Sequence, residues 1–287
     1  MNAKYPEDQA RELREMVDQS HARARVVAVS SGKGGVGKTN LSVNLALALS
    51  ALGSRVILVD VDIGLANADV VLGVKPAATL LDVLVGDCAV EDALTPVPGG
   101  IELLAGSMGV NTVSDLDASQ KKFLIQCFKK LTSLADFIII DTGAGITGNV
   151  ISFAVAADEL LVVTAPEPAS ITDGYALIKA VSREKGHGQI NLVCNKADSL
   201  AEGQGVGQRV KDVCLRFLDL GIGELGCVPW DEKVKRAVRK RKPFILEYPL
   251  CSASIAVKNL ARRILQGSGK AQESKFVDKI TAITERE

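Results

Sequence analysis

The stretch Ser31-Gly32-Lys33-Gly34-Gly35-Val36-Gly37-Lys38-Thr39 joins an apolar run, Val26-Val27-Ala28-Val29, to a helical pattern over 39–52. It contains the spacing G-x4-G-K-[ST], which is typical of a loop that binds phosphate groups. The glycines let backbone N–H groups turn toward phosphate oxygens, and the helix that follows adds the positive end of its dipole. Lys38 would contact the β- and γ-phosphates, and the Thr39 hydroxyl could ligate Mg²⁺. The stretch predicts a nucleoside triphosphate site.

Strands and helices alternate along the chain after this loop. Among the 287 residues, 47% are apolar and only 4% aromatic, a composition that suits a core of buried, aliphatic parallel strands. We predict strands at 26–30, 56–60, 101–105, 137–141, 160–164, 190–194 and 224–228, and helices at 39–52, 78–85, 119–134, 147–156, 172–185, 206–219 and 231–240. Repeated βα units predict an α/β fold: a doubly wound, mostly parallel sheet with helices on both faces.

Three segments make up the predicted organisation: an N-terminal arm (1–24), one domain (25–265) and a polar linker with a short amphipathic segment (266–287). The formal net charge is zero, so contact with nucleic acid or membrane would need a local patch. We find no signal peptide and no apolar run long enough to span a bilayer, and therefore expect a cytoplasmic protein.

Carboxylates follow two of the predicted strands. Asp60-Val61-Asp62 follows the second strand, and Asp141 precedes Thr142-Gly143-Ala144-Gly145. In doubly wound sheets, ligands bind at the carboxyl ends of the strands, which is where these side chains are expected. Asp60 and Asp62 could serve Mg²⁺ or an attacking water, and Asp141 with its glycines is typical of a Walker B aspartate and a mobile switch II loop.

Lys33 makes the loop more specific, because it completes the pattern K-G-G-x-G-K-T. Together with the two aspartate motifs, the chain resembles the MinD/ParA family of dimerising ATPases. The resemblance implies slow, dimer-dependent, regulatory ATP hydrolysis with Mg²⁺. It also implies that Lys33 reaches the phosphates of a second copy in a homodimer, that Asp62 positions the attacking water, and that Asp60 and Asp141 act through the magnesium shell. The implied nucleotide contacts run from Gly32 through Val36 to Asn40.

Within this family the chain is similar to the FlhG-type regulators of flagellar number, over about 25–265. The motifs that carry the likeness are Asp62–Asp69, Asp141–Ile146, Glu167–Lys179 and Val228–Asp231. The arm fits D-Q-A-x-x-L-R, and the resemblance implies that it stimulates the signal-recognition-type GTPase FlhF through Asp8, Gln9, Ala10, Leu13 and Arg14. Flagellar switch-complex proteins or flagellar transcription regulators are further expected partners.

The base could be adenine or guanine. Asn195-Lys196-Ala197-Asp198 fits N-K-x-D, which reads guanine in GTPases. The family resemblance instead implies that Asn195 contacts adenine, with help from Pro229 and Asp231. We favour ATP, because the likeness covers far more of the chain than these four residues.

Two further segments leave alternatives open. The basic run 233–242 is either a solvated helix face or a patch for an anionic partner, and it would be the DNA contact of a ParA-type DNA-segregation ATPase; we expect no specific nucleic acid. The tail places Phe276, Val277, Ile280 and Ile283 on one helical face, so it either binds a membrane weakly or folds back on the domain. Another MinD-like positioning ATPase, or a metabolic P-loop enzyme of the same fold, is the remaining alternative.

Overall fold

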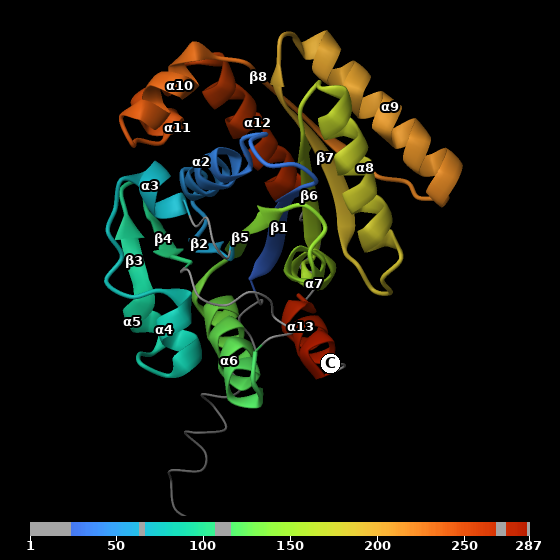
Figure 1. Ribbon diagram of the computed structural model, residues 1–287. Coiled ribbons are helices and arrows are strands. Elements are labelled where there is room, and N and C mark those ends of the chain that lie inside the picture. The colour runs from blue at the N-terminus through green and yellow to red at the C-terminus, as the bar shows by residue number, and fades with distance from the viewer. Residues whose placement is uncertain (1–23, 63–66, 107–115, 268–273, 286–287) are drawn as a thin grey trace, which may run out of the picture.

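An eight-stranded sheet forms the centre of the molecule (Figure 1). The computed structural model describes residues 24–62, 67–106, 116–267 and 274–285. The strand order is β3-β4-β2-β5-β1-β6-β7-β8, and every neighbouring pair is parallel except β3 with β4. This confirms the predicted mostly parallel sheet. The strands are β1 (Arg25–Ser31), β2 (Val56–Asp60), β3 (Leu94–Val97), β4 (Ile101–Leu104), β5 (Phe137–Ala144), β6 (Glu159–Thr164), β7 (Gln189–Ala197) and β8 (Gly223–Pro229).

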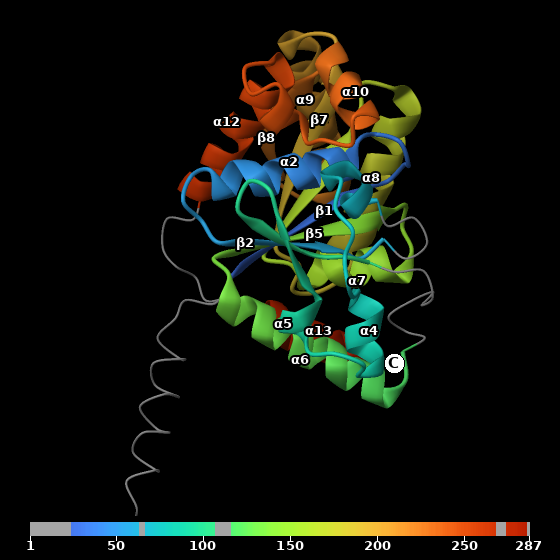
Figure 2. The same ribbon diagram turned by 90° about the vertical axis from the view of Figure 1, so that its left-hand side faces the viewer.

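Helices cover both faces of the sheet, as Figure 2 shows. Residues of β1 alternate between the two cores, with Val26 and Ala28 facing one and Val27 and Val29 the other. One core includes α2 (Lys38–Ser50), α3 (Ala68–Leu72), α10 (Glu232–Arg239), α11 (Phe244–Glu247) and α12 (Ser252–Gln266). The other includes α4 (Leu80–Val85), α5 (Val90–Ala93), α6 (Ala118–Leu134), α7 (Gly148–Ala156), α8 (Pro168–Ser182), α9 (Leu200–Leu218) and α13 (Phe276–Glu285).

Five elements lie where the sequence predicted no regular structure: strand β3, helix α12 and the short helices α3, α5 and α11. Strand β3 contains Thr95 and Pro96, so it lacks the apolar run that marked the other strands, and it pairs antiparallel at the sheet edge. Helix α12 packs on α2 and β8, and its N-cap is Cys251, an unusual capping residue. Helices α8 and α9 also begin earlier than predicted, because Pro168 suits a first helical turn and Ser199 accepts a hydrogen bond from the Glu202 N–H.

The C-terminal helix α13 is folded back on the domain. It packs against α6 and α7, and Phe276 is fully buried with its ring centroid 4.9 Å from that of Phe128. Ser274 donates a 2.5 Å hydrogen bond to Asp158 just before the helix. Of the two alternatives for the tail, the structure shows the one in which its apolar face is part of the core.

The five arm residues implied in FlhF stimulation (Asp8, Gln9, Ala10, Leu13 and Arg14) lie outside the described residues. Within the part of the chain that is described, no helix is both long and apolar enough to cross a membrane.

Candidate nucleotide and magnesium site

A pocket of about 790 Å³ opens at the carboxyl end of the sheet. Its lining includes most of the predicted phosphate loop: Gly34, Gly35, Gly37, Lys38, Thr39 and Asn40. Gly37 has φ +92°, and a Cβ on this residue would lie 2.4 Å from the amide nitrogen of Asn195. Glycine is therefore required there both by the left-handed backbone and by the close neighbour. Helix α2 starts at the next residue, Lys38, so its first N–H groups face the pocket.

Side chains at the end of β7 hold the phosphate loop in shape. The Asn195 amide donates to the Val36 carbonyl at 2.7 Å, and the Lys196 ammonium donates to the Gly35 carbonyl at 2.6 Å. Lys196 has φ +60°, an uncommon backbone for a residue other than glycine. Because these two hydrogen bonds fix the Gly35 and Val36 carbonyls, the loop can direct its N–H groups into the pocket. The N-K-x-D sequence thus acts here partly as a brace, a role that sequence reasoning did not identify.

The base end of the pocket is formed by Asn195, Lys196, Val228, Pro229, Trp230 and Asp231. The Asp231 carboxylate accepts hydrogen bonds from the Lys233 N–H at 2.9 Å and the Ser252 hydroxyl at 2.7 Å, so it caps α10. Asp198, the residue that would read guanine, is not among the lining residues. Trp230 was missed by sequence reasoning, although a tryptophan flanked by Pro229 and Asp231 is a signal for it.

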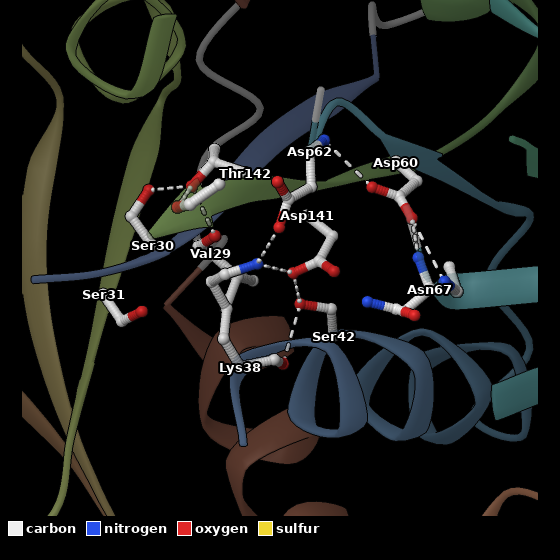
Figure 3. Close-up of polar contacts among 12 residues, drawn as sticks. Val29, Ser30, Ser31, Lys38, Ser42, Asp60, Asp62, Asn67, Asp141 and Thr142 are labelled. Atoms are coloured by element: carbon white, nitrogen blue, oxygen red, sulfur yellow. Dashed lines mark hydrogen bonds and ion pairs between the residues drawn. The ribbon is translucent and has the colours of Figure 1, made fainter. Parts of the chain in front are cut away.

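Lys38 and three carboxylates form a cluster beneath the phosphate loop: Asp60, Asp62 and Asp141 (Figure 3). The Lys38 ammonium donates to Asp141 Oδ1 at 2.9 Å and lies 3.9 Å from Asp62 Oδ2. Ser42 donates to the same Asp141 oxygen at 2.8 Å. Asp141 is fully buried, and its other oxygen, Oδ2, has no hydrogen-bond partner among the residues that the structure describes. Since a buried carboxylate oxygen is rarely left unpaired, Oδ2 is the feature of this cluster that points to a bound cation or its water.

Asp60 accepts more hydrogen bonds than the other two carboxylates of the cluster. It is 1% exposed, and its oxygens accept hydrogen bonds from the backbone N–H groups of Asp62 (3.0 Å), Asn67 (3.0 Å) and Ala68 (3.1 Å). Burial, followed by the nearby charge of Asp141, raises the pKa of Asp60 to about 7. Asp60 therefore holds the segment that carries Asp62 and the start of α3, in addition to contributing charge.

Asp62 is partly exposed and lines the pocket. The pKa of the Asp62 carboxyl is raised above its ordinary value, mainly by burial. The charge of Lys38 opposes this shift, and the charge of Asp141 adds to it. The family resemblance implies that Asp62 positions the attacking water. Of the three aspartates in the cluster, Asp62 is the one that lines the pocket.

The predicted switch II segment, Asp141–Gly145, is attached to β1 in this structure. The Thr142 and Ser30 hydroxyls lie 2.8 Å apart, and the Gly145 N–H donates to the Ser31 carbonyl at 2.8 Å. Gly145 has φ +95°, which favours glycine at the turn into α7. The segment therefore joins the phosphate loop directly to α7.

Lys33 points away from the cluster. Its ammonium lies 3.3 Å from Glu167 Oε2, and both side chains are substantially exposed, at 43% and 64%. The described part of the chain therefore leaves Lys33 at the surface, where a second molecule could reach it.

The oxygen ligands of this site fit Mg²⁺. Asp141 Oδ2 is unpaired, while Thr39 and Asp62 line the adjoining pocket, and hard oxygen donors suit this ion. Among the described residues, no group of three or more His, Cys, Asp and Glu side chains could hold a metal ion unaided.

Comparison with known proteins extends this picture to most of the chain. Residues 24–193 match the family model described as "AAA domain". The antiactivator FleN of Pseudomonas aeruginosa is 44% identical over 240 residues, covering 84% of this chain and 86% of FleN. The flagellum site-determining protein YlxH of Helicobacter pylori is 35% identical, covering 76% of this chain and 74% of YlxH.

Solved structures agree with these relatives. MinD of Pyrococcus horikoshii, complexed with Mg-ADP, has 28% sequence identity and a TM-score of 0.71, covering 87% of this chain and 99% of that one. The cell division ATPase MinD of Pyrococcus furiosus has 29% identity and the same TM-score of 0.71, covering 85% and 99%. The chain belongs to the MinD/ParA family of P-loop ATPases.

Proposed function

We propose that this chain is an ATP-driven switch that controls flagellar number or placement. As a member of its family it is an ATPase whose cofactors are ATP and Mg²⁺. The similarity to YlxH, a flagellum site-determining protein, supports the flagellar role, and the similarity to FleN, an antiactivator, supports a regulatory one. The observation that carries the nucleotide chemistry is the Lys38–Asp141 pair with its unpaired Asp141 Oδ2 beside the pocket.

The residues of this cluster divide the chemistry among them. The loop N–H groups bind the phosphates, and Lys38 leaves Asp141 and Asp62 to contact the β- and γ-phosphates. The Thr39 hydroxyl and Asp141 would hold Mg²⁺, which would neutralise phosphate charge. Asp62, released from Lys38, orients the attacking water. The same lysine thus neutralises the carboxylates before nucleotide binds and the phosphates afterwards.

Lys33 makes the proposed switch dimeric. Among the described residues, its ammonium pairs with one exposed glutamate, Glu167, at 3.3 Å, and an exposed ion pair of this kind holds a side chain weakly. In a homodimer formed in the ATP state, Lys33 of each copy would contact the phosphates bound to the other and stabilise charge that develops during hydrolysis. Hydrolysis then requires two copies and ends the dimeric state.

Size-exclusion chromatography of the Asp62→Ala variant tests this switch. We expect a monomer with ADP and a stable dimer with ATP, because the variant binds nucleotide but hydrolyses it slowly. The wild type should return to monomer as ATP is consumed. Asp69→Ala, on α3 and outside the pocket lining, is the matched control and should behave as wild type. An Asp62→Ala variant that stays monomeric in ATP, or hydrolyses it at the wild-type rate, contradicts the proposal.

The N-terminal arm supplies the proposed link to FlhF. The D-Q-A-x-x-L-R match at Asp8–Arg14 supports this role, with flagellar switch-complex proteins or transcription regulators as further partners of the domain. Removing residues 1–20 should leave basal ATP hydrolysis intact and abolish stimulation of the FlhF GTPase. Substituting Gln9 and Arg14 together by alanine should have the same effect. If either variant stimulates FlhF as well as the full chain does, the arm has a different role.

We propose action in the cytoplasm, with membrane contact only in a state in which α13 leaves α6 and α7. The burial of Phe276, Val277 and Ile280 supports this restriction, because the same side chains cannot face lipid while they are packed in the core. Flotation with anionic lipid vesicles should recover no protein in ADP and at most a small fraction in ATP. Strong recovery in ADP would show that the tail is free.

The exposed basic residues of helix α10 allow a second candidate function, DNA binding. Lys233, Lys235, Arg236 and Arg239 are exposed on it, whereas Lys240 and Lys242, just beyond, pair with Glu247. Salt-sensitive binding of non-specific DNA in ATP would favour a ParA-type role. Absence of DNA binding at low salt favours the flagellar role.

A further inference from the structure

Ser42 is buried one turn after Lys38 on α2 and takes no part in lining the pocket. A serine inside a helix usually bonds its hydroxyl to the carbonyl four residues earlier. Here that carbonyl, Lys38 O, lies 3.1 Å away, but Asp141 Oδ1 lies closer, at 2.8 Å. A hydroxyl has one hydrogen to donate, and the bond to an ionised oxygen is the stronger of the two. The Ser42 hydrogen is therefore directed to Asp141.

The two oxygens of Asp141 have opposite environments. Oδ1 accepts from Lys38 at 2.9 Å and from Ser42 at 2.8 Å, whereas Oδ2 accepts no hydrogen bond from any described residue. Figure 3 shows both donors on the same side of the carboxylate. This arrangement fixes the rotation of the carboxyl group and leaves Oδ2 as the oxygen available to a cation.

Lys38 can hold Asp141 only until nucleotide binds. In the proposed function its ammonium moves to the phosphates, which removes one of the two donors from Oδ1. Ser42 stays, because its backbone belongs to the helix and its side chain has only one rotatable bond to the hydroxyl. It is then the remaining donor that keeps the carboxylate in place.

We propose that Ser42 is a positioning residue for magnesium: it holds Asp141 Oδ1 so that Oδ2 faces the ion in the nucleotide-bound state. The inference rests on the proposed Mg²⁺·ATP site. Side chains that orient a metal ligand typically change metal affinity about 10–100-fold when they are removed. Loss of the Ser42 hydroxyl should therefore weaken the affinity of the nucleotide site for Mg²⁺ and leave the phosphate contacts made by the loop unchanged.

Equilibrium ATP binding at a series of Mg²⁺ concentrations, and in excess chelator, tests this role. The readout is the fluorescence of Trp230, the one tryptophan of the chain, which lines the pocket. For Ser42→Ala we expect the Mg²⁺ concentration for half-maximal enhancement of binding to rise about 10–100-fold. Affinity for ATP in chelator should stay within about twofold of wild type, since a hydrogen bond made outside the phosphate contacts is the only one lost.

A threonine–valine pair separates hydroxyl chemistry from packing. Ser42→Thr and Ser42→Val have nearly the same shape, so any strain in the buried site is common to both. We expect Thr to keep the Mg²⁺ dependence close to wild type and Val to shift it as Ala does. Ser50→Ala, at the end of the same helix, is the control for loss of a serine hydroxyl from α2 and should match wild type.

Two results would overturn the inference: a Mg²⁺ dependence of Ser42→Ala equal to wild type, or equal impairment of the Thr and Val variants. If Ser42→Ala does not fold, the Thr–Val comparison decides between the same two readings. Failure of the wild type to bind ATP at all is a different result, because it contradicts the proposed function itself.

Discussion

The two ends of the sheet each bury a carboxylate beside a cation, with opposite outcomes. At the carboxyl end, the described residues give one oxygen of Asp141 two hydrogen-bond donors and the other oxygen none. At the amino end, Arg25 binds Glu159 Oε2 and the Asn191 amide donates to Glu159 Oε1 at 2.7 Å. Both oxygens of Glu159 are thus satisfied. A completed buried network holds strands together, whereas an incomplete one beside a pocket is available to a ligand.

Substituting the two cations separates these roles with the largest expected effects. Lys38→Met and Arg25→Met each strip a buried carboxylate of its cation, so both should lower the free energy of unfolding by about 3–5 kcal/mol. Only Lys38→Met should also weaken ATP binding, by about 30–1000-fold, because Lys38 is the one of the two cations that we propose to contact phosphate. Urea denaturation and ATP titration measure the two effects. Comparable loss of ATP affinity in Arg25→Met would erase the distinction between the ends.

Helix α13 packs near the amino end of the sheet, and substitutions in it test whether this end has a purely structural role. Phe276 is fully buried against Phe128, so Phe276→Ala should lower the free energy of unfolding by about 3–5 kcal/mol and leave ATP affinity unchanged. Ala282→Ser, on the exposed side of the same helix, should stay within about 0.5 kcal/mol of wild type. A loss below about 1 kcal/mol for Phe276→Ala, on the same energy scale, would show that the helix is undocked in solution.

The carboxyl end should also respond to pH. The folded pKa of Asp60 is about 7 against an ordinary 3.8, so between these values the folded state binds a proton that the unfolded state has lost. The stability from this group is fully present below about pH 4 and declines as pH rises toward 7, by at most about 1.4 kcal/mol per pH unit. Denaturation at pH 5 and 7 without nucleotide should show a smaller decline for Asp60→Asn. A decline equal to wild type excludes Asp60 as its source; the exposed Asp212→Asn on α9 is the control.

The brace on the phosphate loop gives the smallest expected effect. Lys196→Met keeps the side-chain stem but loses the 2.6 Å hydrogen bond to the Gly35 carbonyl. One net hydrogen bond corresponds to about 2–10-fold in affinity, so ATP binding should weaken by that factor with little change in stability. Lys211→Met, on α9, is the matched control and should bind as wild type does. Unchanged affinity in Lys196→Met would show that the loop keeps its shape without the brace.

The sequence predicted the elements of the fold that are determined by a local pattern of residues. Strands such as Ile138–Ile140 are continuous apolar runs because both faces of a parallel sheet are buried, and the phosphate loop needs its glycines at fixed spacing. Strand β3 escaped prediction because Pro96 and an exposed edge remove that pattern. Helix boundaries at α8 and α9 were displaced because their caps lie in segments without apolar periodicity.

The interactions that define the site could be located only in part. Lys38, Asp62 and Asp141 belong to recognisable motifs. Ser42 contacts Asp141, which lies 99 positions away in the sequence, and no motif around Ser42 predicts that contact. The same holds for the Arg25–Glu159 pair, separated by 134 positions. Such contacts depend on the strand order that brings β1, β5 and β6 together, which no short segment encodes.

A crystal structure of the chain with Mg²⁺ and a non-hydrolysable ATP analogue tests the account most directly. We expect the phosphates in the loop and the Lys38 ammonium more than about 4 Å from Asp141 Oδ1, with Asp141 Oδ2 turned to the ion or its water. Nucleotide bound in the loop while Lys38 keeps its 2.9 Å bond to Asp141, or nucleotide bound elsewhere, would contradict the account.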